Sequence, residues 1–202
     1  MRVLPTNLLV CVSLTLAGCS GGPDLSPVAT RSYDSESMAK AAIQQFDKNT
    51  NGTLELAELD SCPGLKATFT HIDTNNDNKL TAEELKARFE GYRTAGAVGY
   101  TLRVTLDGIP LPDATATLTP ESFMNGAISE VTGKTTADGT LSKYSVDGRE
   151  LPGLPSGVYR VTVTKDGLGL PAKYNTQSTL GCEVSGGGRG GNSGYDVRLT
   201  KK

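Results

Sequence analysis

The chain has 202 residues, which is enough for one medium-sized domain or two small ones. Its formal net charge is only −2, from 20 basic and 22 acidic residues, so no overall positive charge indicates a nucleic-acid partner. With a single histidine in the sequence, a zinc site lacks ligands and a histidine-based catalytic site has little support.

Charge and residue types divide the chain into two parts. Residues 34–90 carry eleven acidic and six basic residues, whereas residues 91–202 carry ten acidic and twelve basic ones. Most of the 24 glycines also fall in the second part, which suits β structure rich in turns. We therefore expect two units with different roles.

The chain begins with the features of an export signal. Arg2 precedes an apolar stretch over 8–16, which is too short to span a bilayer but suits the core of a signal peptide. The sequence Leu16-Ala17-Gly18-Cys19 resembles the lipobox of bacterial lipoproteins. This resemblance implies a signal peptide over 1–18 and a membrane anchor at Cys19, with diacylglycerol on the thiol and a second acyl chain (palmitate) on the new amino group.

The residues after Cys19 refine this expectation. Ser20, where the sorting pattern of such lipoproteins has Asp for inner-membrane retention, favours the outer membrane. An ordinary secretory signal, in which Cys19 has no special role, is the alternative. Residues 19–34 are rich in Ser, Gly and Pro and predict a flexible tether. We expect an exported protein, anchored by lipid to the bacterial cell envelope.

A helical pattern begins at Ser35, with Asp34 or Ser35 as its N-cap, and leads into a loop over 47–58. Oxygen-bearing side chains occupy alternate positions of this loop, and Gly52 stands at the sixth position, where the chain must turn sharply. Calcium is a hard cation that takes oxygen ligands, so the pattern predicts a calcium site. Its expected ligands are Asp47, Asn49, Asn51, the carbonyl group of Thr53, and Glu58.

Residues 73–84 repeat this pattern in a second loop. The sixth position holds Asn78 instead of glycine, and because asparagine tolerates a left-handed backbone we expect only a modest penalty. Leu54 and Leu80 occupy matching positions of the two loops and are expected to pair. The expected ligands of the second loop are Asp73, Asn75, Asp77, the carbonyl group of Lys79, and Glu84.

The two loops and their flanking apolar faces resemble the EF-hand family over residues 36–92. The resemblance implies an all-α EF-hand pair over 35–93 with Ca²⁺ as its cofactor. Pro63-Gly64 breaks the chain between the loops, so the helix that leaves the first loop must be short and a wide, calmodulin-like opening is not expected. With few acidic ligands in each loop, we expect weak sites of roughly 0.1–1 mM, which favour a structural ion over a signal.

Beyond residue 93 the pattern changes from helical to alternating. Short runs of alternating apolar and polar residues, separated by turn signals such as Asp107-Gly108 and Asp138-Gly139, predict about seven strands. They lie at 100–106, 114–119, 129–136, 140–146, 157–165, 178–184 and 195–200. Strands of this length and spacing predict an all-β sandwich over 98–202.

Three motifs of this second part are similar to the carboxypeptidase-regulatory or transthyretin-like sandwich: Val104–Ala114, Thr136–Gly139 and Pro155–Val161. The resemblance implies an immunoglobulin- or transthyretin-like fold, but no particular activity, because such sandwiches serve many roles. The second part contains no histidine, so the chemistry of a transthyretin-like hydrolase is not expected. We expect this sandwich to mediate an interaction, with a protein or a polysaccharide, or to act as a spacer.

The sequence thus predicts a non-enzymatic, lipid-anchored, calcium-binding envelope protein without catalytic residues. One alternative is a calcium sensor, in which ion binding changes how the two domains dock. Another is an accessory or degenerate hydrolase subunit whose sandwich binds a substrate. The cysteines that remain after anchoring, Cys62 and Cys182, either form a disulfide between the domains or stay as separate thiols.

Overall fold

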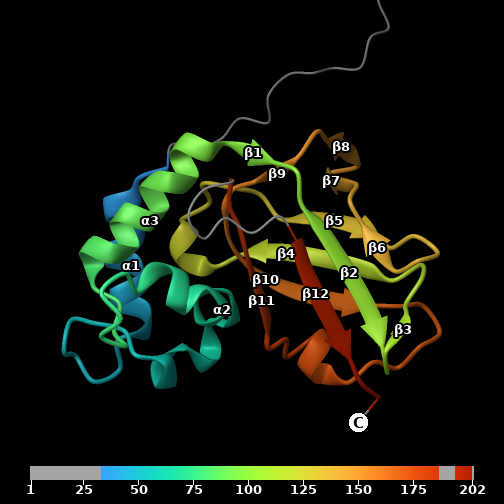
Figure 1. Cartoon of the computed structure of the whole chain (residues 1–202), viewed down its shortest axis with the longest axis horizontal. Coiled ribbons are helices and arrows are strands. Elements are labelled where there is room, and N and C mark those ends of the chain that lie inside the picture. The colour runs from blue at the N-terminus through green and yellow to red at the C-terminus, as the bar shows by residue number, and fades with distance from the viewer. Residues whose placement is uncertain (1–32, 187–193, 202) are drawn as a thin grey trace, which may run out of the picture.

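The structure is a computed structural model that describes residues 33–186 and 194–201. Helices come first, over 35–95, and a strand-rich region follows, which confirms the expected order of an α part and a β part (Figure 1). The expected signal peptide, the lipidation residue Cys19 and the tether up to residue 32 lie outside the described residues. Within the described ranges, no helix has the length and apolar character that a bilayer crossing requires.

The α part consists of three α-helices and one short 3₁₀ helix. They are α1 (Ser35–Phe46), η1 (Leu56–Ser61), α2 (Pro63–Ile72) and α3 (Ala82–Ala95). Asp34 caps α1, because its carboxylate accepts a hydrogen bond from the backbone N–H of Ser37 at 3.0 Å. Pro63 begins α2 and separates it from η1, so the helix that leaves the first loop is as short as the sequence predicts.

The β part contains twelve strands among the described residues, most of them short. They are β1 (Ala97–Val98), β2 (Thr101–Leu106), β3 (Ile109–Pro110), β4 (Thr115–Pro120), β5 (Val131–Lys134), β6 (Thr140–Leu141), β7 (Tyr144–Val146), β8 (Arg149–Leu151), β9 (Leu154–Pro155), β10 (Gly157–Thr164), β11 (Leu180–Val184) and β12 (Gly194–Leu199). Two further 3₁₀ turns are η2 (Ser122–Met124) and η3 (Ala172–Tyr174).

These strands form two main sheets and one isolated pair. The larger sheet has six strands in the order β11-β10-β4-β5-β7-β8, and the smaller one has the order β12-β2-β3 with β6 also paired to β2. Strands β1 and β9 pair separately. Figure 1 shows β2 and β12 crossing in front of β4 and β10. All pairs in the larger sheet are antiparallel, whereas β12 runs parallel to β2.

The sheets differ from the expected strands in two places. The run over 140–146, expected as one strand, forms two: β6 pairs with β2 in the smaller sheet and β7 pairs with β5 in the larger one. The chain therefore passes from one sheet to the other between residues 141 and 144. The short strands β1, β3, β8 and β9 were not expected, because two or three residues are too few to show an alternating pattern.

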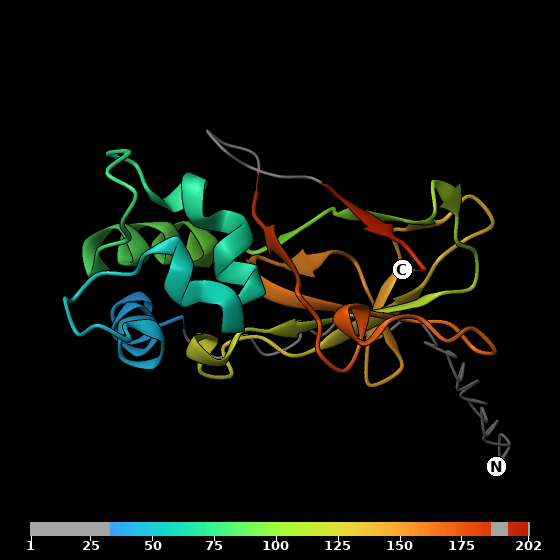
Figure 2. The same ribbon diagram turned by 90° about the horizontal axis from the view of Figure 1, so that it is seen from below.

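The larger sheet has a face that is turned toward the helices. Figure 2 shows the helices gathered at one end of the strand region, with α2 against β10 and β11. Two glycines allow this close contact. A Cβ atom added to Gly181 of β11 would lie 2.1 Å from the carbonyl carbon of Pro63, and one added to Gly64 of α2 would lie 2.8 Å from the carbonyl oxygen of Tyr159. The first turn of α2 therefore packs directly on the backbone of the sheet.

The helices and the sheets share one continuous apolar core. Phe123 of η2, a turn that follows β4, lies among the helices and is fully buried. Its ring stacks on Phe89 of α3 with centroids 5.3 Å apart, and it meets Phe46 of α1 edge-on at 6.4 Å. Burial of one such ring contributes about 2–3 kcal/mol, so the two parts stabilise each other.

The two described cysteines are free and buried. Cys182 pairs in register with Tyr159, whereas its neighbours Gly181 and Glu183 contact the helices. Since successive side chains of a strand point to opposite faces, Cys182 points away from α2, at whose start Cys62 lies. Burial raises the pKa of the Cys182 thiol to about 12. Of the two alternatives, the structure has the separate thiols.

The contact between α2 and β11 yields a prediction. Gly181→Ala should lower the free energy of unfolding by about 1–3 kcal/mol, because the new methyl group has no space against Pro63. Gly91→Ala is the control: its added Cβ meets nothing within 4 Å on the exposed side of α3, so a gain of roughly 0.5–1 kcal/mol in helix propensity is expected. Urea unfolding measures both, and equal stability of Gly181→Ala and the parent would contradict the packing.

Candidate metal sites

Each candidate loop connects two helices. The first loop, over 47–58, begins where α1 ends and runs into η1, and the second, over 73–84, begins where α2 ends and runs into α3. The structure therefore places all ten expected ligands in two helix–loop–helix units. In each unit the residues at the first position, Asp47 and Asp73, also serve as the C-caps of the entering helices.

The first loop is held together by hydrogen bonds from its own backbone to the expected ligand side chains. Asp47 accepts from the N–H groups of Asn51 (3.2 Å) and Gly52 (2.8 Å). Asn49 Oδ1 accepts from Asn51 N at 3.0 Å, and Asn51 Oδ1 accepts from Thr53 N at 2.9 Å. The oxygens of Asp47 and Asn49 keep a further lone pair, whereas Asn51 Oδ1 also accepts from the Thr53 hydroxyl at 2.8 Å.

The second loop repeats these contacts position by position. Asp73 accepts from the N–H groups of Asp77 (3.2 Å) and Asn78 (2.9 Å). Asn75 Oδ1 accepts from Asp77 N at 2.9 Å, and Asp77 Oδ1 accepts from Lys79 N at 2.9 Å. Two different sequences thus adopt one loop conformation.

The backbone dihedrals show the same repetition. The fourth and sixth positions have positive φ in both loops: +59° and +82° at Thr50 and Gly52, and +59° and +62° at Asn76 and Asn78. Asn78 therefore takes the left-handed conformation that was expected of it. A glycine at this position is favourable but not required.

The last carboxylate of each loop closes the loop onto its start. Glu58 accepts from the backbone N–H of Lys48 at 2.8 Å and of Glu55 at 3.0 Å. Glu84 accepts equivalently from Thr74 N and Thr81 N, both at 3.1 Å. Burial opposes the charge of Glu84, but hydrogen bonds from Thr81 and Thr74 outweigh it, and the pKa of Glu84 is lowered. The carboxylate is thus favoured in its charged, ligating form.

A short β-bridge joins the two loops. Leu54 N donates to Leu80 O at 3.0 Å, and Leu80 N donates to Leu54 O at 2.9 Å, with both side chains fully buried. Lys79 Nζ lies 3.6 Å from Glu55 Oε1 across the same junction. The expected pairing of the two leucines is therefore present, and the loops form one unit.

Glu55, at the ninth position of the first loop, holds the side chains of two expected ligands. Its carboxylate accepts hydrogen bonds from the side-chain amide nitrogens of Asn49 (3.2 Å) and Asn51 (2.7 Å). An amide group can present either its oxygen or its nitrogen, and these bonds fix the nitrogens away from the loop's backbone donors. The Asn49 oxygen keeps a lone pair for a cation, whereas the Asn51 oxygen accepts from both the N–H and the hydroxyl of Thr53.

The acidic side chains among the expected ligands lack basic partners. Among residues 33–186 and 194–201, none of the five acidic expected ligands takes part in an ion pair. Glu58 and Asp73 are only 6% and 7% exposed. Buried carboxylates without a cation are costly, so this donor set fits a hard divalent ion such as calcium.

The described residues hold no cluster of three or more His, Cys, Asp and Glu side chains arranged for a metal. The expected ligands of the two loops include only two and three carboxylates, and the other oxygens come from asparagine amides and backbone carbonyls. This set of ligands suits a cation that accepts neutral oxygen ligands, as calcium does. It lacks the nitrogen and sulfur ligands that zinc takes in proteins.

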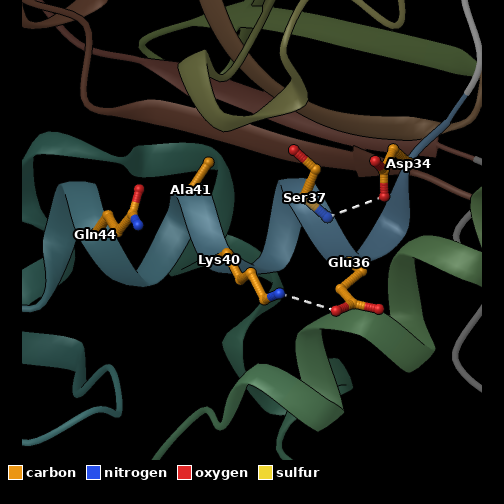
Figure 3. A pocket seen from close by; sticks show the side chains of 6 residues that line it. All are labelled: Asp34, Glu36, Ser37, Lys40, Ala41 and Gln44. Carbon is orange, nitrogen blue, oxygen red and sulfur yellow. Dashed lines mark hydrogen bonds and ion pairs between the residues drawn. The ribbon is translucent and has the colours of Figure 1, made fainter.

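A surface hollow of about 460 Å³ lies along the outer face of α1 (Figure 3). Its lining residues are Asp34, Glu36, Ser37, Lys40, Ala41 and Gln44. Lys40 pairs with Glu36 at 2.9 Å, and Asp34 caps the helix through Ser37. These polar side chains pair with one another on the exposed surface, so the hollow lacks the features of a ligand-binding site.

Comparison with known families bears on the second loop. The family model of the EF hand matches residues 65–89, which include the whole second loop with most of α2 and half of α3. The first loop lies outside the match and is supported by its residue pattern and its geometry. No curated protein matches the chain.

Proposed function

We propose that this protein binds two calcium ions, one in each loop, and that the ions are structural. The observation that carries the proposal is the repetition of one ligand-orienting hydrogen-bond pattern in both loops. The EF-hand match over the second loop supports it, and so do the five carboxylates without a basic partner.

In each loop the side chains at the first, third and fifth positions would supply one oxygen each, and the carbonyl of Thr53 or Lys79 a fourth. Glu58 and Glu84 would supply both carboxylate oxygens. Calcium contributes positive charge that offsets the repulsion among these oxygens and links the start of each loop to its end. The second loop has three acidic ligands and the first has two, so we propose that the second loop binds more tightly.

Phe123 supports a structural ion over a sensor. In sensors, ion binding opens a pair of helices and exposes an apolar groove to a target. Here Phe123, from the β part of the same chain, already fills the space between Phe46 and Phe89. An opening movement would have to expel this ring, so the helices have no free groove to offer.

We also propose that Cys19 carries a lipid anchor and that the protein resides in the bacterial envelope, most of it outside the membrane. This part of the proposal rests on the sequence Leu16-Ala17-Gly18-Cys19. We propose a non-enzymatic role for the β part, as a spacer or as a surface for a protein or polysaccharide. The sequence of this part contains no histidine.

Calcium titration by calorimetry tests the ion sites. The parent protein should bind two ions, Glu58→Gln should abolish binding to the first loop, and Glu84→Gln should abolish binding to the second, because each loses a bidentate carboxylate. Glu90→Gln, on the exposed side of α3 outside both loops, is the matched control and should bind two ions. No heat of binding up to several millimolar calcium would refute the proposal.

Cell fractionation tests the anchor. Cys19→Ser should move the protein from the membrane fraction to the soluble fraction, because the thiol that accepts the lipid is lost. Cys11→Ser, within the predicted signal peptide, should leave the protein with the membranes. A Cys19→Ser protein that stays with the membranes would exclude anchoring through this residue.

A further inference from the structure

One buried carboxylate contacts both helices of the second EF-hand unit. Glu183 lies on β11, and its side chain is only 1% exposed. Its Oε1 accepts hydrogen bonds from Arg88 Nε at 2.5 Å and from the Tyr92 hydroxyl at 2.6 Å, and its Oε2 lies 3.0 Å from His71 Nδ1. We refer to these four residues as the Glu183 cluster.

The positions of these partners relative to the second loop matter. His71 is the residue before the last in α2, which enters the loop, whereas Arg88 and Tyr92 lie on α3, which leaves it. The loop between them carries the expected ligands from Asp73 to Glu84. A change in the angle between α2 and α3 would therefore draw at least one partner away from Glu183.

Such a separation is expensive. Glu183 is a charge in a buried position, and hydrogen bonds to charged groups are stronger than those between neutral ones. Removal of one partner from a buried ion pair leaves an uncompensated charge. Arg88 is further held by the Tyr92 ring, which lies 5.8 Å below its guanidinium group. The sheet holds Glu183 in place, because this residue lies in register with Val158, one pair from the end of the β10–β11 ladder.

We propose that Glu183 fixes the angle between α2 and α3 and thereby preorganises the second loop for its ion. The inference rests on the proposed calcium binding. Because the same angle suits both the ion and the sheet, calcium in the loop and docking on β11 stabilise each other. The β part is then the element that sets the calcium affinity of the second loop.

A second buried carboxylate at the same interface provides the control. Glu121, after β4, is 5% exposed and accepts from Gly64 N at 2.9 Å, at the start of α2. Its carboxylate also forms an ion pair with Arg160 of β10 at 3.6 Å. Burial raises the pKa of Glu121 despite these bonds. Of the two helices α2 and α3, the hydrogen bonds and ion pairs of this carboxylate reach only α2, at the end away from the second loop, so it cannot fix the angle to α3.

The first measurement is calcium calorimetry on the full-length chain with Glu58→Gln, which leaves the second loop as the intact one. Adding Glu183→Gln should weaken calcium binding on the order of fivefold, because part of the preorganisation is lost. Tyr92→Phe, which removes one hydroxyl and keeps the ring, should weaken it less. Glu121→Gln should leave the affinity unchanged.

The second measurement reports the helix angle directly. Spin labels at Ala67→Cys on α2 and Ala87→Cys on α3, both exposed, give an interhelical distance by pulsed electron resonance. Cys11 and Cys19 are replaced by serine, and the buried Cys62 and Cys182 stay unlabelled. Without calcium, the labelled parent protein should show a narrow distribution of interhelical distances. The Glu183→Gln variant should show a broad distribution that narrows when calcium is added.

The outcomes separate the two proposals. A folded Glu183→Gln protein with unchanged calcium affinity and a narrow calcium-free distribution would overturn the role of Glu183 and leave calcium binding intact. Loss of affinity in Glu121→Gln equal to that in Glu183→Gln would also overturn it, because general loosening of the interface would then be the cause. Absence of calcium binding in the Glu58→Gln parent would refute the second ion site itself.

Discussion

The close contact between the first turn of α2 and the backbone of β11 determines how the two parts of this protein are arranged. It exists because Gly64 and Gly181 present no side chains at the point of contact, where added Cβ atoms would collide with backbone. Once α2 lies at this distance, Glu183 comes within reach of α2 and α3, and Phe123 comes between α1 and α3. The helices are therefore fixed by the sheet and not only by each other.

This arrangement explains why the candidate calcium sites suit a structural ion. Each loop connects elements that are already held at both ends, and the β-bridge of Leu54 and Leu80 ties one loop to the other. The loop carboxylates repel one another without an ion, and a cation would remove that repulsion while the helices stay in place. Calcium binding would then raise the free energy of unfolding of the whole molecule and would not cause a large conformational change.

The sequence alone revealed the loops because their information is local. The spacing of Asp, Asn, Gly and Glu within a few residues predicts both the oxygen ligands and the turns of the loop. Even the left-handed conformation of Asn78 could be predicted from its residue type. The sequence did not reveal the Glu183 cluster, because Arg88 lies 95 positions away and the only signal is one charged residue in an otherwise apolar strand. Phe123 was missed for the same reason, and the parallel pairing of β12 with β2 depends on tertiary contacts that no local pattern encodes.

The central claim is that calcium stabilises the helices and the sheets together. Thermal unfolding followed at once by the helical circular dichroism signal and by the near-ultraviolet tyrosine signal tests it most directly, because five of the seven tyrosines lie in the β part. We expect one coincident transition, whose midpoint rises when calcium is added and falls back when a chelator removes the ion. Two separate transitions, with the midpoint of the tyrosine transition unchanged by calcium, would contradict this claim.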